Sequence, residues 1–205
     1  GWGERVMTSR WELGVDDLDP PALCIDLPLL EANIARMASF FADRHADVRP
    51  HTKTHKSPLL AHKQLDAGAI GITCAKLSEA ETMTQAGIDD VLIANQIVGH
   101  RKIARLVGLA AHSRVIVAVD DPSNVAELDA AAQAKGVDLR VLVEVDIGMG
   151  RCGAEPGESA VTLAQQVAAA AGLRFEGIMG YEGHAVMIPD YAERRRQTEA
   201  SLKLL

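Results

Sequence analysis

The densest group of reactive side chains lies at residues 49–56, which read Arg-Pro-His-Thr-Lys-Thr-His-Lys. The preceding residues favour a strand over 46–53, and Pro50 predicts an irregular strand end because proline cannot donate a ladder hydrogen bond. A lysine at a shielded, cation-rich strand end, as Lys53 would be, is the kind of amine that forms a Schiff base with a carbonyl compound. The residues alone also allow a solvated basic turn.

Two other local motifs are weak indicators of a site. His51 and His55 are four residues apart, but on a strand and its exit turn their side chains need not converge, and no third ligand follows in a zinc-like spacing. Residues 148–153 match G-x-G-x-x-G, yet a dinucleotide fingerprint belongs to the first strand–helix turn of its domain, and four predicted units precede this one. We therefore expect neither a histidine metal site nor NAD binding here.

Further polar residues follow other predicted strands. Arg151 would present a guanidinium to a ring nitrogen or a carboxylate, unless it forms a surface ion pair with Asp146 or Glu144. Tyr181 and His184 lie in Gly-Tyr-Glu-Gly-His, where the glycines let backbone approach a ligand closely; a core tyrosine and a turn histidine are the alternative. Asn95 ends another strand. These residues are candidates for one shared site.

The elements that must position these residues form a repeating pattern. From residue 46 onward, short β-branched runs alternate with Ala-, Leu- and Glu-rich segments, which indicates βα units in a parallel sheet. Six units are predicted, with strands at 46–53, 69–75, 90–95, 114–120, 139–146 and 175–180. Periodicity does not separate an open doubly wound sheet from a (β/α)8 barrel. Because the polar clusters lie at strand ends, and barrel loops converge on one mouth, we expect a TIM-like barrel truncated after about six units.

Residues 1–45 are predicted to be a separate N-terminal extension. It would contain a short strand at 21–26 and an amphipathic helix at 29–42 that covers one end of the sheet. Residues 46–205 would form the partial α/β barrel.

Composition excludes several classes of protein. The chain has 205 residues, of which 48% are hydrophobic and 24% charged, so a packed core is expected rather than disorder. The formal charge of -7 gives no electrostatic reason to bind nucleic acid or an anionic membrane, and no apolar run is long enough to span a bilayer. The three cysteines are scattered and the N-terminus lacks the apolar segment of a signal peptide, so we expect a cytoplasmic protein.

Five segments together resemble the D-threonine aldolase and D-serine dehydratase group of fold-type III pyridoxal phosphate proteins, which are related to the alanine racemase N-terminal barrel. The segments are 49–56, 71–81 (Gly-Ile-Thr-Cys-Ala-Lys-Leu-Ser-Glu-Ala-Glu), 90–96 (Asp-Val-Leu-Ile-Ala-Asn-Gln), 146–153 (Asp-Ile-Gly-Met-Gly-Arg-Cys-Gly) and 180–184. The resemblance spans nearly the whole chain and implies the alanine racemase type of barrel.

The resemblance also implies roles for five residues. Lys53 would bind pyridoxal 5'-phosphate covalently, and Arg151 would contact its pyridine nitrogen. Tyr181 would lie near the cofactor, and His184 and Asn95 would occupy the same mouth. In this family the late strands that hold the phosphate, and the C-terminal β-domain with its metal ligands, follow the residue where this chain ends. We therefore expect no metal site within the chain.

For the intact protein, the resemblance implies a metal-activated lyase that cleaves β-hydroxy-D-amino acids, such as D-threonine into glycine and acetaldehyde. Manganese is the divalent metal expected beside the cofactor, and a homodimer is the expected assembly. One alternative is dehydration of D-serine or 3-hydroxyaspartate. An alternative of another class is a non-catalytic pyridoxal phosphate carrier, which does not usually show the pattern of residues 49–56.

Overall fold

The computed structural model describes residues 14–205, so the first thirteen residues of the predicted N-terminal extension lie outside the described part. Five strands form one parallel sheet: β1 (Ile72–Cys74), β2 (Asp90–Gln96), β3 (Arg114–Val119), β4 (Leu139–Val145) and β5 (Leu173–Gly180). The helices that precede or connect these strands are α2 (Pro58–Asp66), α3 (Leu77–Gln85), α4 (His100–Ala110), α5 (Pro122–Lys135) and α6 (Glu158–Ala169). Five of the six predicted strands are thus present.

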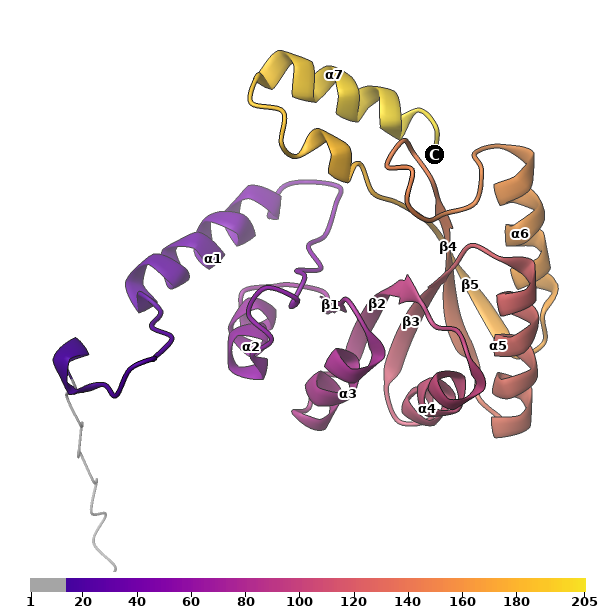
Figure 1. Cartoon of the computed structure of the whole chain (residues 1–205), viewed down its shortest axis with the longest axis horizontal. Helices are drawn as coiled ribbons and strands as arrows, with labels where there is room; N and C mark the ends of the chain where they lie inside the picture. The colour runs from indigo at the N-terminus through magenta and orange to yellow at the C-terminus, as the bar shows by residue number, and fades with distance from the viewer. Residues whose placement is uncertain (1–13) are drawn as a thin grey trace, which may run out of the picture.

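The order of the strands distinguishes a barrel winding from a doubly wound sheet. Neighbours in the sheet follow the chain order from β1 to β5, with no reversal. Since parallel crossovers are right-handed, connections that all advance in one direction return on the same side of the sheet. Figure 1 shows α3 to α6 along one side of the curved sheet. A doubly wound sheet would reverse its strand order and place helices on both faces, so the barrel prediction is confirmed.

The predicted strand at 46–53 is wrong in extent. Only His51 pairs with β1, as an isolated parallel bridge to Thr73. The Thr73 N–H donates to the carbonyl of Pro50 and the Thr52 N–H donates to the carbonyl of Thr73, both at 2.8 Å. The next hydrogen bond of a parallel ladder, towards the N-terminus, would have to be donated by the backbone N–H of residue 50. Proline has no N–H at that position. The pairing therefore does not extend into a regular strand.

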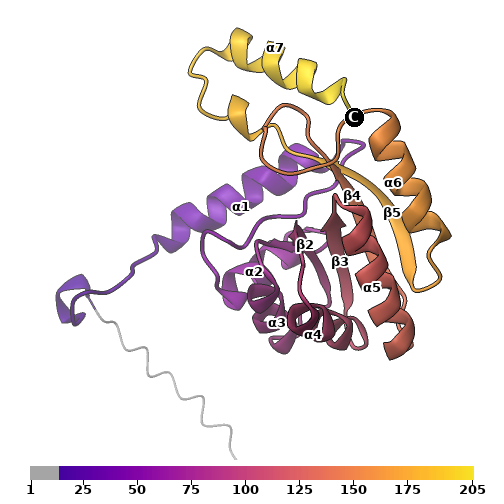
Figure 2. The same ribbon diagram turned by 45° about the vertical axis from the view of Figure 1, so that its right-hand side comes forward.

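The predicted strand at 21–26 is also wrong. No strand forms there, and Pro20 and Pro21 have no N–H with which to enter a ladder. The predicted helix does form, as α1 (Leu27–Phe41), and Asp26 caps it by accepting the Leu29 N–H at 3.0 Å. However, no residue of α1 is buried, and α1 extends beside the sheet in Figure 2. The expected cover over one end of the sheet is therefore not found among residues 14–205.

The last elements lie beyond the carboxyl end of β5. A single turn, η2 (Gly183–Ala185), leads to α7 (Tyr191–Leu202), which Figure 1 shows above that end of the sheet. A short turn, η1 (Val15–Asp17), precedes α1. None of the helices among residues 14–205 is both long and apolar enough to cross a membrane.

Local signals explain where several helices begin and end. Ser57 and Asp121 cap the first turns of α2 and α5 through their side-chain oxygens, and each is followed by a proline, which suits the first helical position. α5 ends at Gly136, whose φ of 69° lies in the left-handed region that favours glycine.

The core lies between the sheet and helices α3 to α6. Alternate strand residues such as Val91, Val117 and Val143 are fully buried and belong to one cluster with helix residues such as Leu106 and Leu128. Successive strand side chains point to opposite faces. The residues of opposite parity therefore line the other side of the sheet, which we call the concave face.

The concave face carries an ion-pair network near the amino ends of the strands. Asp90 lies 2.6 Å from Arg49 and 3.7 Å from Arg140, and Arg140 lies 2.8 Å from Glu176. These side chains are 13–20% exposed. Hydrogen bonds from Arg140 are the largest cause that lowers the pKa of Glu176 from 4.5 to about 2, with a further contribution from Arg174. The network ties the segment before β1 to β2, β4 and β5.

We predict that Glu176→Gln destabilises the protein in a pH-dependent way. The folded pKa of Glu176 is below the unfolded value, so its stabilisation is present above pH 4.5 and is lost as the pH falls from 4.5 towards 2. The difference in unfolding free energy between wild type and Glu176→Gln should be at most about 3 kcal/mol at pH 7 and should shrink over that window. Urea unfolding at several pH values measures it. Glu199→Gln, which breaks an exposed pair with Arg195, is the control and should cost little. A difference that does not vary with pH would contradict the assignment.

Candidate functional site

Lys53 lies on a turn that is held at both ends. Thr52 is fully buried, and its hydroxyl donates to the carbonyl of Thr73 at 3.0 Å. The Lys56 N–H donates to the carbonyl of Thr52 at 2.7 Å, and Lys56 itself has a φ of 51°, in the left-handed region. Non-glycine residues seldom adopt this conformation, and they do so where the surroundings enforce it. The turn presents Lys53 to solvent at the carboxyl edge of the sheet.

A buried carboxylate supports this turn from below. Glu79 is 8% exposed and accepts the Ala75 N–H at 2.8 Å, while its other oxygen lies 3.6 Å from the Lys56 ammonium. Asn95, at the end of β2, donates its side-chain N–H to the carbonyl of Ala75 at 2.9 Å. The amide of Asn95 therefore bonds to the protein backbone, and the segment after β1 is held from two sides.

His51 contacts the backbone of Lys53 directly. Its Nδ1 accepts the Lys53 N–H at 3.2 Å. Burial, followed by the positive charge of Lys53, lowers the pKa of His51. The imidazole is therefore neutral at neutral pH, which agrees with its role as an acceptor and helps to orient the turn.

The loop after β4 is closed by hydrogen bonds to carboxylates. Asp146 accepts the N–H groups of Gly148 and Gly150, each at 3.0 Å, and these bonds lower the pKa of Asp146. Gly153 donates its N–H to Asp120 at 3.0 Å. A Cβ at Gly153 would lie 2.4 Å from the backbone nitrogen of Asp146, so only glycine fits there. Together these bonds define the path of the loop that carries Arg151.

Arg151 pairs with the aromatic residue that follows β5. Its guanidinium carbon lies 5.7 Å from the centroid of the Tyr181 ring, and Tyr181 is 42% exposed. This is a cation–π distance. Among residues 14–205, Arg151 has no ion pair with an acidic residue, so the alternative of a surface ion pair is not found. The pair presents a guanidinium and a phenol at the same edge of the sheet.

His184 lies on η2 and contacts α7. Its Nε2 is 3.4 Å from the hydroxyl of Ser201, which is 4% exposed. All five predicted residues lie at one edge of the sheet: Asn95 is near the carboxyl end of β2, and the other four lie on segments that follow a strand or the His51 bridge. Among residues 14–205, Arg151 and Tyr181 form a cation–π pair, and no side-chain hydrogen bond or ion pair joins any two of the five.

The structure adds residues that the sequence analysis did not include among the candidate site residues, and Glu144 was considered there only as a possible ion-pair partner of Arg151. Glu144 on β4 is 5% exposed and accepts hydrogen bonds from Gln96 of β2 and from Cys152 of the Arg151 loop. A single acidic residue within the apolar run of 139–145 is a signal that could have identified it.

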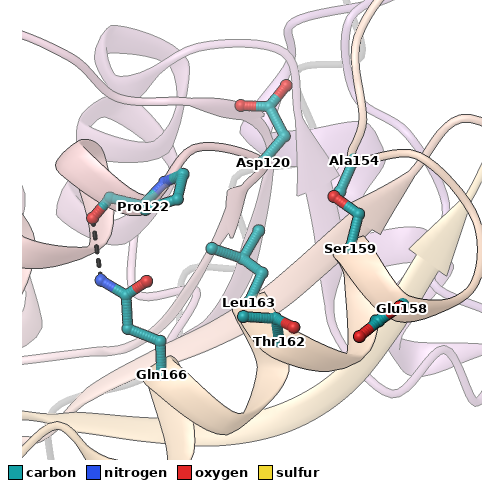
Figure 3. A pocket seen from close by; sticks show the side chains of 8 residues that line it. All are labelled: Asp120, Pro122, Ala154, Glu158, Ser159, Thr162, Leu163 and Gln166. Carbon is teal, nitrogen blue, oxygen red and sulfur yellow. Dashed lines mark hydrogen bonds between the residues drawn. The ribbon is translucent and has the colours of Figure 1, made fainter.

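Two hollows lie away from these residues. A cleft of about 420 Å³ opens between the first turns of α5 and α6 (Figure 3). Across its wall, Gln166 donates to the carbonyl of Pro122 at 2.9 Å. Its lining residues are Asp120, Pro122, Ala154, Glu158, Ser159, Thr162, Leu163 and Gln166. A groove of about 790 Å³ runs between α1 and the end of α2. Neither hollow is lined by any of the five predicted residues.

The donor set at the carboxyl edge is suited to an aldehyde cofactor with a planar, charged ring. Lys53 supplies an exposed primary amine that makes no side-chain hydrogen bond or ion pair with any of residues 14–205. Arg151 and Tyr181 supply a donor and an aromatic face. No group of three His, Cys, Asp or Glu side chains in the described part of the chain could hold a metal ion.

Comparison with known proteins shows the family. Residues 25–204 match the family of the alanine racemase N-terminal domain. A D-threonine aldolase of an Arthrobacter species is 40% identical over 183 residues, which cover 89% of this chain and 47% of that protein. A 3-hydroxy-D-aspartate aldolase of Paracoccus denitrificans is 38% identical over 206 residues, covering 95% of this chain and 53% of that protein. The crystal structure of D-threonine aldolase from Filomicrobium marinum superposes with a TM-score of 0.91 and 43% identity, covering 93% of this chain and 52% of that one. The chain thus spans about half the length of these relatives.

We predict that Thr52→Val loosens the Lys53 turn. The substitution removes a buried hydroxyl that bonds to the carbonyl of Thr73, while the Thr52 N–H still satisfies that carbonyl. The expected cost is about 1 kcal/mol in the free energy of unfolding, with faster hydrogen exchange at the Lys56 amide. Urea unfolding and exchange mass spectrometry measure these changes. Thr54→Val, at an exposed position, is the control. Equal effects of the two substitutions would contradict the role of Thr52.

Proposed function

This chain belongs to the alanine racemase N-terminal domain family, and we propose that the protein it forms part of is a pyridoxal phosphate-dependent lyase that cleaves β-hydroxy-D-amino acids. The observation that carries this proposal is the free amine of Lys53, held on a constrained turn at the edge where Arg151 and Tyr181 also lie. The similarity to a D-threonine aldolase and a 3-hydroxy-D-aspartate aldolase supports this choice of reaction and substrate class.

The chain's own residues would bind and orient the cofactor. Lys53 would attach to the aldehyde carbon through its amine, and His51 would keep the Lys53 backbone in place through its neutral Nδ1. Arg151 would donate a hydrogen bond to the ring nitrogen, with the Tyr181 ring against its guanidinium. Asn95 and His184 would lie at the rim of the same mouth, although the side chain of Asn95 bonds to the backbone of Ala75 and Gln96, and His184 contacts Ser201.

Pyridoxal phosphate, when bound, supplies an electron sink for the pair released from the broken Cα–Cβ bond. A divalent metal, for which we propose manganese, would assist removal of the proton from the substrate's β-hydroxyl group. We propose that its ligands come from the complete protein, which would be a cytoplasmic homodimer acting on a small amino acid.

We predict that Lys53 is the amine that binds the cofactor. Borohydride reduction of the complete protein loaded with pyridoxal phosphate, followed by peptide mapping, should place the pyridoxyl label on Lys53. Lys53→Ala should lose the label, whereas Lys56→Arg, which keeps the cation beside Glu79, should retain it. A label on Lys56 or Lys76 would overturn the assignment.

We predict carbon–carbon cleavage for the complete protein. With D-threonine and manganese, glycine and acetaldehyde should be the main products, and L-threonine is the matched control that should react poorly. Product analysis by chromatography measures both. Formation of 2-oxobutanoate and ammonia would instead support a dehydratase. Binding of the cofactor without turnover of any β-hydroxy-D-amino acid would support a carrier.

A further inference from the structure

A buried carboxylate lies behind the loop that carries Arg151. Glu144 is 5% exposed at the carboxyl end of β4, on the concave face. Gln96 Nε2 donates to one of its oxygens at 2.6 Å, and the Cys152 thiol donates to the other at 3.2 Å. No ion pair joins Glu144 to a basic side chain among residues 14–205. We call these three residues the Glu144 chain.

The Glu144 chain satisfies a charge that is costly to bury. An isolated carboxylate in a protein interior is strongly disfavoured unless each oxygen is hydrogen-bonded or paired. Gln96 reaches Glu144 at a point where β2 is irregular, because the pairing of β2 with β3 shifts between Ile93 and Gln96. Asn95 accepts the Gln96 N–H at 3.0 Å within this irregularity. The carboxyl ends of β2 and β4 are therefore joined through the Glu144 carboxylate.

The Glu144 chain ends at Cys152, next to Arg151. Cys152 follows Arg151 directly, so the thiol that bonds to Glu144 and the guanidinium that lies over Tyr181 are carried by adjacent residues of one loop. The pKa of the Cys152 thiol is raised: burial is the largest cause, Arg151 lowers the pKa, and Glu144 raises it. The thiol therefore stays protonated at neutral pH, as a donor to Glu144 must be.

The backbone of Glu144 also holds the far end of the Arg151 loop, where Ala154 comes back beside β4. The Ala154 N–H donates to the carbonyl of Glu144 at 2.8 Å, and the Asp146 N–H donates to the carbonyl of Ala154 at 3.0 Å. These bonds define where the loop returns to β4. Between these anchored ends, the Cys152 thiol donates to the Glu144 side chain at 3.2 Å.

We propose that Glu144 is a positioning residue, which acts through the Cys152 thiol, with Gln96 as its second partner, to hold the Arg151 guanidinium over the Tyr181 ring. This is the place where the proposed function puts the cofactor ring, and that part of the inference rests on the proposed function. The link between Glu144 and the Cys152 thiol does not, and can be tested without cofactor.

The first test measures the reactivity of Cys152 in the cofactor-free protein. Alkylation by iodoacetamide at pH 8, followed by peptide mass spectrometry, gives a rate for each cysteine. Glu144→Gln removes the negative charge beside the thiol, which lowers its pKa, so Cys152 should react faster, by about tenfold for each pKa unit. Cys24, which is exposed, is the internal reference, and Cys74, which is buried, reports whether the fold is intact. Glu79→Gln removes another buried carboxylate and should leave the Cys152 rate unchanged.

An unchanged Cys152 rate in Glu144→Gln, with Cys74 still protected, would overturn the proposal. If Cys74 also becomes reactive, the substitution has disrupted the fold, and Gln96→Leu then provides the test. That variant keeps the charge of Glu144 but removes its other donor, so Glu144 should bind the thiol more strongly and Cys152 should react more slowly than in wild type. A rate equal to or above that of wild type would overturn the proposal.

The second test measures cofactor affinity and spectrum in the complete protein. Cys152→Ala removes the donor to Glu144, whereas Cys152→Ser keeps one. The dissociation constant for pyridoxal phosphate should rise about tenfold in Cys152→Ala, with a shifted pH dependence of the visible absorbance, and should stay close to wild type in Cys152→Ser. Equal behaviour of the two variants would overturn the positioning role. If wild type binds no cofactor, the proposed function fails, and the alkylation result still decides the link between Glu144 and Cys152.

Discussion

The order of the strands is the constraint on which the rest of the structure depends. Because β1 to β5 are parallel neighbours in chain order, each right-handed connection returns on the same side of the sheet. Helices α3 to α6 therefore bury one face, and the strands end together at one edge (Figure 2). The strand order alone therefore brings side chains that are far apart in sequence, from Lys53 to His184, to that edge. Chemistry at the carboxyl edge follows from the winding.

On the concave face, carboxylates have different partners at the amino ends and at the carboxyl ends of the strands. Near the amino ends, Asp90 and Glu176 are each paired with arginines, so charges of opposite sign tie neighbouring strands together. Near the carboxyl ends, the donors to the Glu144 side chain within residues 14–205 are the neutral groups of Gln96 and Cys152. The first arrangement neutralises charge between neighbouring strands. The second leaves one negative charge beside the loop that carries a cationic candidate site residue.

The sequence predicted the fold better than the contacts within the site. Five of six strands were predictable because β-branched runs and helix signals act over a few residues, and the barrel was predictable from the polar clusters at the strand ends. The extent of the first strand was not predictable, because the effect of Pro50 on the pairing depends on how this segment lies beside Thr73. Glu144 was considered only as a surface ion-pair partner of Arg151. Its burial and its bond to Gln96 were missed because a strand buried on both faces shows no alternation, and Gln96 is 48 residues away. All five candidate residues lie at the predicted edge, but the Asn95 bond to the backbone of a neighbouring loop had no sequence signal.

A crystal structure of the complete protein grown with pyridoxal phosphate tests most directly whether this edge is the cofactor site. We expect continuous electron density from the Lys53 side chain to the cofactor, with the ring beside Arg151 and Tyr181. Density joined to another lysine, or a cofactor bound in the cleft between α5 and α6, would contradict the account.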